Sequence, residues 1–199
     1  MIPIVVRWCT AALVGLVAIT SLDPRPAQAA DPTGTWLTED RRARVRTEFC
    51  GPGNSHLCGY IVWGSKPLDE GGKPRRDQDN PDPRKQGRPL LGHQMILGLK
   101  PNAEGRHEGR IYNGDNGKSY DVTIWSETPS ELSVKGCMLA VLCGTQTWTR
   151  VTDVLPGQLQ GATNTEGGPR ADPEWAPKPG AAPAAPKTRP AAPPPSAPR

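Results

Sequence analysis

Short runs that alternate polar and apolar residues recur along the middle of this chain, and they limit it to a fold built from strands. The two-residue period of a half-buried strand is visible in residues 44–49 (RVRTEF) and again in residues 120–124 (YDVTI). Gly, Pro and Asn gather between such runs, as at 51–54 and 113–117, and these clusters predict turns. No stretch of helical length shows a 3.6-residue period. We therefore expect an all-β domain.

About eight strands are predicted in this region, and short links between most of them indicate antiparallel neighbours. Eight such strands can close into an up-and-down barrel, which removes the exposed edges of the sheet. A sandwich of two sheets is the alternative that the pattern leaves open. The expected strands lie near 34–39, 43–50, 58–64, 95–100, 107–113, 118–126, 131–137 and 144–151.

The first thirty residues have the features of a secretory signal peptide. Arg7 precedes an apolar run from Ala11 to Ile19, and small residues from Ala27 to Ala29 form a cleavage site. The apolar run is too short to span a bilayer. We predict cleavage near Ala29 or Ala30 and a periplasmic or secreted mature protein with no transmembrane segment.

The charge balance argues against a nucleic-acid partner. The sequence has 24 Lys and Arg against 20 Asp and Glu, so loss of Arg7, Arg25 and Asp23 with the signal leaves 22 against 19, a net charge of +3. This small excess is scattered along the chain, whereas nucleic-acid binding calls for a clustered basic face.

The composition changes after Thr152, where Pro, Ala, Gly and polar residues take over and continue to Arg199. Such a segment lacks the apolar surface that would offset its loss of conformational entropy on folding. We therefore expect a domain at residues 31–152 and a disordered tail at 153–199, so that truncation after Thr152 leaves thermal stability nearly unchanged. From Lys178 onward the tail carries basic residues and no acidic one. Contact with an anionic cell-envelope surface is a further hypothesis.

Five cysteines occur in the chain, and Cys9 lies in the signal peptide. An even set of four then remains, which predicts disulfides in an oxidising compartment. We expect Cys50–Cys58 and Cys137–Cys143, because each pair brackets a turn between two strands. A crossed pairing and a metal site are the alternatives, although zinc sites favour the tighter Cys-x-x-Cys spacing.

Residues 64–94 form a connection far longer than a hairpin link, and loops of this length are often functional lids or inserts. Their charges nearly balance, with seven basic and five acidic residues from Lys66 to Arg88. The run DQDNPD at 77–82 resembles a calcium loop, but Pro81 and Asp82 stand where such a loop needs a ligand and a glycine. We expect a solvated run of turn-capping acidic residues instead.

No catalytic motif is recognised in the sequence. The histidines His56, His93 and His107 are predicted on a turn, at the edge of the long loop and on an exposed strand. None of them has metal-ligand spacing to another ligand type, and neither a nucleophile elbow nor a phosphate-binding loop occurs. We predict a protein without catalysis and without a cofactor. An enzyme would need two of His56, His93, Asp77 and Asp82 to meet in a pocket.

A series of ordered motifs runs through residues 31–151. They are GTWLTED at 34–40, CGYIVW at 58–63, PLDEGGKP at 67–74, NPDP at 80–83, RPLLG at 88–92, GRIYN at 109–113, GKSYDVTI at 117–124 and VKGCMLAVLCGTQTWTR at 134–150. This series resembles the bacterial domain of unknown function 2147 family. The resemblance implies a secreted or periplasmic lipocalin-like barrel, and it implies no reaction.

Lipocalin-type barrels carry a Gly-x-Trp on the first strand and an Arg at the last strand, and the two meet where the sheet closes. The resemblance assigns this closure to Gly34, Trp36 and Arg150. The guanidinium would stack over the indole in a cation–π contact worth very roughly 0.5–2 kcal/mol. Direct contact between Trp36 and a ligand is the alternative.

A barrel of eight strands is either filled by its side chains or roomy enough for one small ligand. We expect a small hydrophobic or amphipathic ligand, with 64–94 as its lid. Arg110, Tyr112 and Tyr120 are the candidate head-group site, because the first two share a strand face and the third follows the next turn. A filled barrel that serves as a cell-envelope interaction or structural module is the alternative. The expected interior residues are Val45, Phe49, Val62, Tyr120, Val122, Ile124, Leu132 and Val134.

Overall fold

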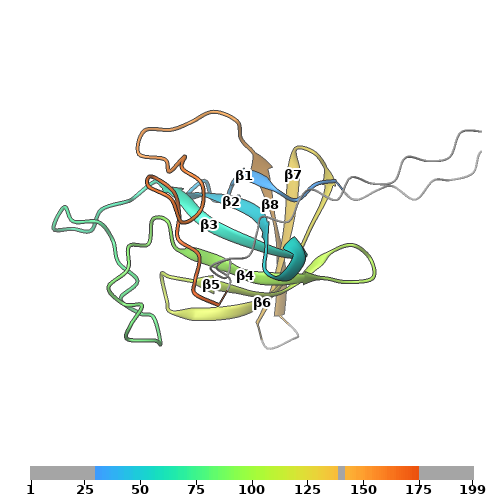
Figure 1. The fold of residues 1–199 in the computed structure, drawn as a ribbon, viewed down its shortest axis with the longest axis horizontal. Coiled ribbons are helices and arrows are strands. Elements are labelled where there is room, and N and C mark those ends of the chain that lie inside the picture. Colours follow the sequence, from blue (N-terminus) through green and yellow to red (C-terminus); the bar gives the residue numbers. More distant parts are fainter. Residues whose placement is uncertain (1–29, 139–141, 175–199) are drawn as a thin grey trace, which may run out of the picture.

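The structure is a computed structural model that describes residues 30–138 and 142–174. Its strands follow one another around a closed barrel (Figure 1), in which each pairs with the next and the first pairs antiparallel with the last. This result confirms the predicted up-and-down barrel and excludes the sandwich. The strands are β1 (Gly34–Leu37), β2 (Ala43–Cys50), β3 (His56–Gly64), β4 (Gln94–Pro101), β5 (His107–Asn113), β6 (Lys118–Thr128), β7 (Glu131–Met138) and β8 (Leu142–Arg150).

Both predicted disulfides are confirmed, and each lies within a hairpin. Cys50 is bonded to Cys58 across the β2–β3 hairpin, whose turn contains the short 3-10 helix η1 (Pro52–Asn54). Cys137 and Cys143 stand directly opposite each other on β7 and β8. The crossed pairing and a metal site at these cysteines are therefore excluded. Among the helices of the described ranges, none has the length and apolar character that a membrane crossing needs.

Side chains fill one end of the barrel. Trp36 is fully buried there, and its indole N–H donates to the hydroxyl of Thr47 at 2.9 Å and to the carbonyl of Pro32 at 3.2 Å. Its polar atom is therefore satisfied inside an apolar cluster. The other fully buried members of this cluster at the filled end are Leu57, Ile96, Leu99, Ile124 and Leu132.

Arg150 closes the same end. Its guanidinium carbon lies 4.1 Å from the centroid of the Trp36 ring. The guanidinium also donates to the carbonyl of Thr33 at 2.6 Å, to that of Asp31 at 2.8 Å and to that of Pro129. At Gly34 the backbone has φ of 133°, and a Cβ there would collide with this guanidinium. Gly34, Trp36 and Arg150 thus form the closure that the sequence resemblance implies.

The chain beyond β8 does not leave the barrel at Thr152. Residues 153–174, here called the C-terminal segment, pack against the outside of β2, β3 and β4 (orange to red in Figure 1). Leu159 N–H donates to the carbonyl of Val62 at 2.9 Å, and Arg170 N–H donates to that of Gly92 at 2.8 Å. The expectation of a disordered tail over 153–199 is therefore wrong for residues 153–174. Residues 175–199 and the expected signal peptide at 1–29 lie outside the described residues.

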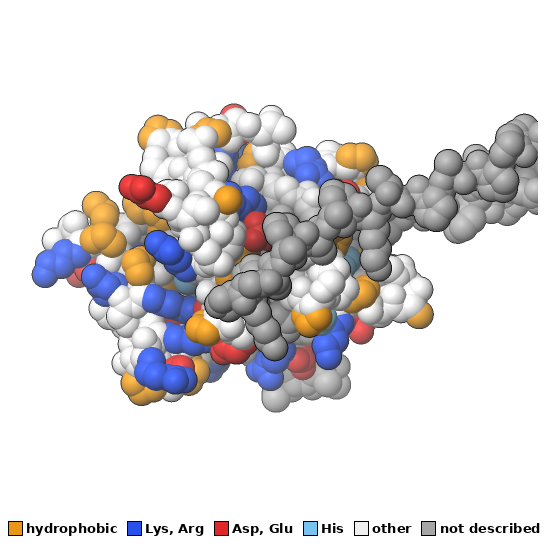
Figure 2. All heavy atoms as spheres, in the orientation of Figure 1, with side chains coloured by type: hydrophobic (Ala, Val, Ile, Leu, Met, Phe, Trp, Pro, Cys, Tyr) orange, Lys and Arg blue, Asp and Glu red, His pale blue; other side chains and the backbone are white. Residues whose placement is uncertain are grey.

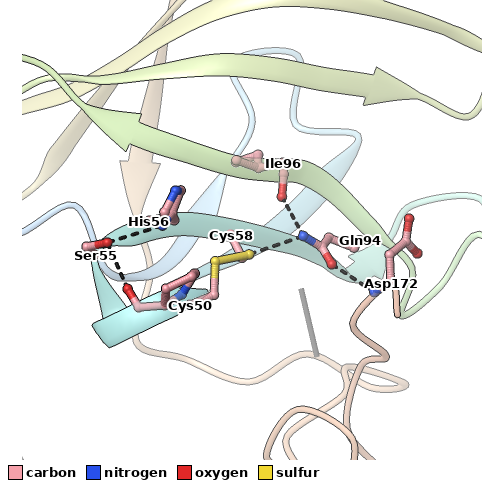
Figure 3. The surroundings of a disulfide bond; sticks show 8 residues. Cys50, Ser55, His56, Cys58, Gln94, Ile96 and Asp172 are labelled. Carbon is pink, nitrogen blue, oxygen red and sulfur yellow. Dashed lines mark hydrogen bonds between the residues drawn. A yellow bond between two sulfur atoms is a disulfide. The ribbon is translucent and has the colours of Figure 1, made fainter. Parts of the chain in front are cut away.

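Gln94 joins the C-terminal segment to the first disulfide (Figure 3). Its side-chain amide donates to Cys58 Sγ and to the carbonyl of Ile96, both at 3.1 Å, while its oxygen accepts the N–H of Asp172 at 2.8 Å. Ala171 packs beside this disulfide against Tyr60, and burial raises the pKa of the tyrosine. The outer face of β3 is consequently a second, smaller core rather than a solvated surface.

Two of the expected interior residues lie elsewhere. Val62 is buried, but Ile61 before it lines the lumen, so strand alternation places Val62 on the outer face under the C-terminal segment. The ring of Phe49 is 43% exposed and lies 6.0 Å from the ring of His107. The error at Val62 arises because the C-terminal segment covers the outer face of β3, so a buried residue there need not face the lumen.

Candidate functional site

The barrel is hollow at the end opposite the closure by Arg150. A cavity of about 520 Å³ extends from the middle of the lumen to the segment between β3 and β4, residues 65–93, here called the lid. Lid residues Pro67, Leu90 and Leu91 contribute to its wall. The apolar side chains that line the lumen part are Val45, Ile61, Met95, Ile111, Val122, Val134 and Trp148. The lumen is therefore filled by side chains at one end and hollow at the other.

Charged residues stand where this cavity meets the lid. Arg42, Lys66 and Arg75 line it there, as do Asp40 and Asp115. Asp115 accepts from the guanidinium of Arg75 at 3.0 Å and lies 3.6 Å from that of Arg42. Lys66 makes no ion pair or hydrogen bond through its side chain within the described part of the chain. The mouth of an apolar cavity thus carries more positive than negative groups.

The structure does not bring Arg110, Tyr112 and Tyr120 together as one head-group site. On the β5–β6 pair, Arg110 faces Asp121 while Ile111 faces Tyr120, so Tyr120 lies on the lumen side with Ile111. Arg110 is exposed and donates to the carbonyl of Ser119 at 3.2 Å. Tyr112 shares the outward face of Arg110, although it lies beside the cavity mouth. Of the three, Tyr112 and Tyr120 line the cavity and Arg110 does not.

Tyr112 instead belongs to a buried polar cluster under the lid. Its hydroxyl donates to Asp77 at 2.5 Å, and this carboxylate also accepts from the Asn80 amide at 2.7 Å and from Arg88 Nε at 2.8 Å. Asp77 is fully buried. It is therefore not part of a solvated acidic run, and the lid folds around it because its charge must be matched inside the protein. Burial and the hydrogen bond to Asp77 raise the pKa of Tyr112.

Arg88 connects this cluster to the C-terminal segment. Its guanidinium donates to Asp77 on one side and to Asp172 on the other, at 2.8 and 2.7 Å. The ammonium of Lys85 reaches the second oxygen of Asp172 at 2.7 Å. These side chains, Asp77, Lys85, Arg88, Tyr112 and Asp172, are here called the clasp, because they tie the lid to β5 and to the C-terminal segment.

His93 lies next to the clasp, where the lid ends. Its Nδ1 lies 2.6 Å from the carbonyl of Leu90, a contact that requires Nδ1 to carry the proton, and its buried Nε2 has no partner among the described residues. Burial, and then the neighbouring charge of Arg88, lower the pKa of His93 to about 4. The ring is therefore neutral at neutral pH, with one unpaired acceptor.

His93 and Asp77 are two of the four residues, with His56 and Asp82, of which an enzyme would need a pair to meet in a pocket. Both touch Tyr112, His93 with ring centroids 5.9 Å apart and Asp77 through its hydrogen bond. However, Asp77 lines neither cavity and its oxygens are occupied, so it offers no free base to a bound molecule. In the described ranges, no three His, Cys, Asp or Glu side chains group as metal ligands.

The sequence contains some of the signal for this cluster. The motifs NPDP and RPLLG place Asn80 and Arg88 in a long loop, and a charged loop of this length needs internal partners if it is ordered. Nothing local indicates that Asp172, 84 residues after Arg88, completes the ion pairs. The capping role expected for the acidic run holds at Asp82, whose carboxylate accepts the N–H of Arg84 at 3.0 Å in a turn.

Comparison with solved structures places this barrel in a known class. Protein HP1028 from the human pathogen Helicobacter pylori, which belongs to the lipocalin family, aligns with a TM-score of 0.50 and 21% identity. The alignment covers 62% of this chain and 84% of that chain. At this identity the likeness concerns the fold alone. The protein is a lipocalin-like β-barrel.

Comparison with protein families then gives the particular family. Residues 34–150 match DUF2147, described as an uncharacterized protein conserved in bacteria. The chain belongs to this family, as its ordered motifs predicted. The match begins at Gly34 and ends at Arg150, so it contains both ends of the closure and omits the C-terminal segment. No curated protein matches the chain.

Proposed function

We propose that this protein is exported and binds a small hydrophobic or amphipathic ligand in its lumen without catalysis. The observation that carries the proposal is the empty half of the barrel, because its volume of about 520 Å³ falls in the range of ligand sites. Its walls are mainly aliphatic and aromatic, so an apolar ligand would gain free energy by leaving water. The cations at the mouth favour a ligand with an acidic head group.

The alternative, a filled barrel that acts as a cell-envelope module, has less support. In a filled barrel, the packing around Trp36 and Ile124 would continue up to the lid. The described side chains instead leave a cavity in the part of the lumen next to the lid. The basic part of the sequence on which an envelope contact would depend begins at Lys178 and lies outside the described residues.

Export is supported by two independent features. The first thirty residues have the pattern of a signal peptide, and two disulfides join neighbouring strands. Disulfides of this structural kind persist in oxidising compartments such as the periplasm. Amino-terminal sequencing of protein recovered from the periplasm of an expressing bacterium tests this, and a start near Ala30 is the expected result.

Ligand binding is tested by titration of the protein with a fluorescent fatty acid as the probe. Met95→Trp enlarges a side chain that lines only the lumen cavity, so we expect it to weaken binding of the probe by about tenfold. Val154→Trp is the matched control, because Val154 is 51% exposed and lines neither cavity. Native mass spectrometry of gently purified protein is expected to show a retained lipid-sized mass. Probe binding that is absent, or equal in both variants, would contradict a ligand site in the lumen.

A further inference from the structure

A second hollow lies on the outside of the barrel, between the lid and the C-terminal segment. Its volume is about 560 Å³, close to that of the lumen cavity. On the view in Figure 2, lysine and arginine side chains gather over the lid side of the molecule. The apolar residues that line the outer hollow and not the lumen are Leu68, Pro74, Pro89, Leu159 and Ala171.

The two hollows share part of their walls. Pro67, Arg75, Leu91 and His93 line both of them. The first two are held in the lid by backbone hydrogen bonds, since Arg75 N–H donates to the carbonyl of Pro67 at 3.0 Å. A molecule seated at this shared wall could therefore reach into the lumen on one side and into the outer hollow on the other.

Positive charge is concentrated at and beyond the shared wall. Arg75 stands at the boundary itself, and Arg88 and Arg170 line the outer hollow, against one carboxylate, Asp172. Asp172 and Arg88 are already paired with each other in the clasp. The side chain of Arg170 is exposed and has no ion pair or hydrogen bond within the described residues. A negatively charged group between the hollows would thus meet Arg75, which also binds Asp115, with Lys66 on one side and Arg170 on the other.

We propose that the ligand has two apolar arms and one anionic head group, as a two-chain phospholipid does. One arm lies in the lumen, the other lies in the outer hollow, and the head group lies at Arg75. This inference rests on the proposed function and names its ligand class. A single-chain ligand would cover one hollow and leave a second apolar hollow of similar size in water, which is unfavourable for a surface of this kind.

The experiment compares an anionic ligand that has two apolar arms with an anionic ligand that has one. Short-chain phosphatidic acid and a single-chain fatty acid of the same chain length each compete with the fluorescent fatty acid for binding to the purified protein. Leu68→Trp narrows the outer hollow, and we expect it to weaken phosphatidic acid binding by about tenfold while fatty acid binding stays within twofold. Val154→Trp is the control, because Leu68 and Val154 are both 51% exposed and only Leu68 lines the hollow.

A second variant addresses the same hollow without adding bulk. Arg170→Glu replaces an exposed cation that lines only the outer hollow, so we expect binding of phosphatidic acid to weaken more than binding of the fatty acid. Circular dichroism and the melting temperature verify that each variant is folded. If neither variant changes the preference between the two ligands, the two-armed ligand is wrong although the lumen site stands. If Met95→Trp also leaves both ligands unaffected, the proposed function itself fails.

Discussion

The guanidinium of Arg150 at the end of β8 lies over the indole of Trp36 on β1, 4.1 Å from the ring centroid. The two residues are also directly opposite each other in the antiparallel pairing of these strands. The closing pair of the barrel is short, with only two residue pairs in register, Trp36 with Arg150 and Leu37 with Thr149. The side-chain contact therefore supplements a sheet pairing that has few hydrogen bonds of its own.

Substitution Arg150→Ala is expected to lower the free energy of unfolding by about 2–4 kcal/mol. It removes a cation–π contact, and it leaves the half-buried carbonyl of Thr33 and the exposed carbonyl of Asp31 without their charged donor. Arg150→Lys is expected to recover part of this loss, because it restores the charge without the planar fork. Urea unfolding followed by tryptophan fluorescence measures both changes.

A second cation–π pair in the same protein provides the control. Arg106 lies 4.3 Å from the ring centroid of Trp125, and Arg106 is exposed. Because solvent weakens such contacts at the surface, Arg106→Ala is expected to cost about 0.5–1 kcal/mol. Equal losses for Arg106→Ala and Arg150→Ala would show that Arg150 has no special role in closure.

Strands and disulfides could be predicted because their signals are local. The alternation in β2 and β6, and the turn residues beside them, are readable from a few neighbouring positions. The head-group site was not predictable in this way. A shift of one residue in register decides which face a side chain occupies, and the pairing of Ile111 with Tyr120 separates Tyr120 from Arg110.

The C-terminal segment escaped prediction for a different physical reason. It has few apolar residues and no periodicity, and it is held by single backbone hydrogen bonds and by ion pairs to residues far away in the sequence. Arg44 on β2 is an example, since its buried guanidinium donates to the carbonyl of Asp153 at 2.7 Å and to the Gln158 side chain at 2.9 Å. Composition indicates how much apolar surface a segment can bury by itself. It does not indicate which hydrogen-bond and ion-pair partners a folded barrel presents to that segment.

Truncation after Thr152 is accordingly expected to destabilise the protein. It leaves the guanidinium of Arg44 without its oxygen partners and uncovers Tyr60 and Val62. We expect the melting temperature to fall by at least about 5 °C, which corresponds to roughly 1.5 kcal/mol in a domain of this size. Differential scanning calorimetry measures the shift. Truncation after Glu174 is the control, and equal melting temperatures for the two truncated proteins would show that the C-terminal segment adds no stability.

Loss of the disulfide between Cys50 and Cys58 is expected to cost about 2–3 kcal/mol, as the closure of a short loop predicts. Cys58 is fully buried, and the amide of Gln94 donates to its sulfur. Cys50→Ala with Cys58→Ala therefore also removes an acceptor beneath the C-terminal segment. The equivalent double variant at Cys137 and Cys143 keeps that region intact. Urea unfolding should show the larger loss for the first pair, and limited proteolysis should cut the C-terminal segment faster in that variant alone.

His93 makes stability depend on pH in a defined window. Its pKa is lowered to about 4 in the folded protein by burial and by Arg88, while Leu90, Asp77 and Asp172 oppose this shift. An unfolded histidine titrates near 6.5, so between these values the unfolded state binds more protons than the folded state. The contribution of His93 to the free energy of unfolding is therefore fully present above about pH 6.5. It is lost as the pH falls toward 4, by roughly 3 kcal/mol in total.

The substitution His93→Asn isolates this effect, because an asparagine amide can donate to the carbonyl of Leu90 as Nδ1 does, yet it does not titrate. We expect the variant to lose most of the pH dependence of the free energy of unfolding between pH 6.5 and 4. Burial also lowers the pKa of His107, so a smaller dependence of the same sign remains, and His107→Asn should remove that part. Guanidinium chloride unfolding at several pH values measures these slopes. A slope in His93→Asn equal to that of the parent protein would show that titration of His93 does not cause the pH dependence.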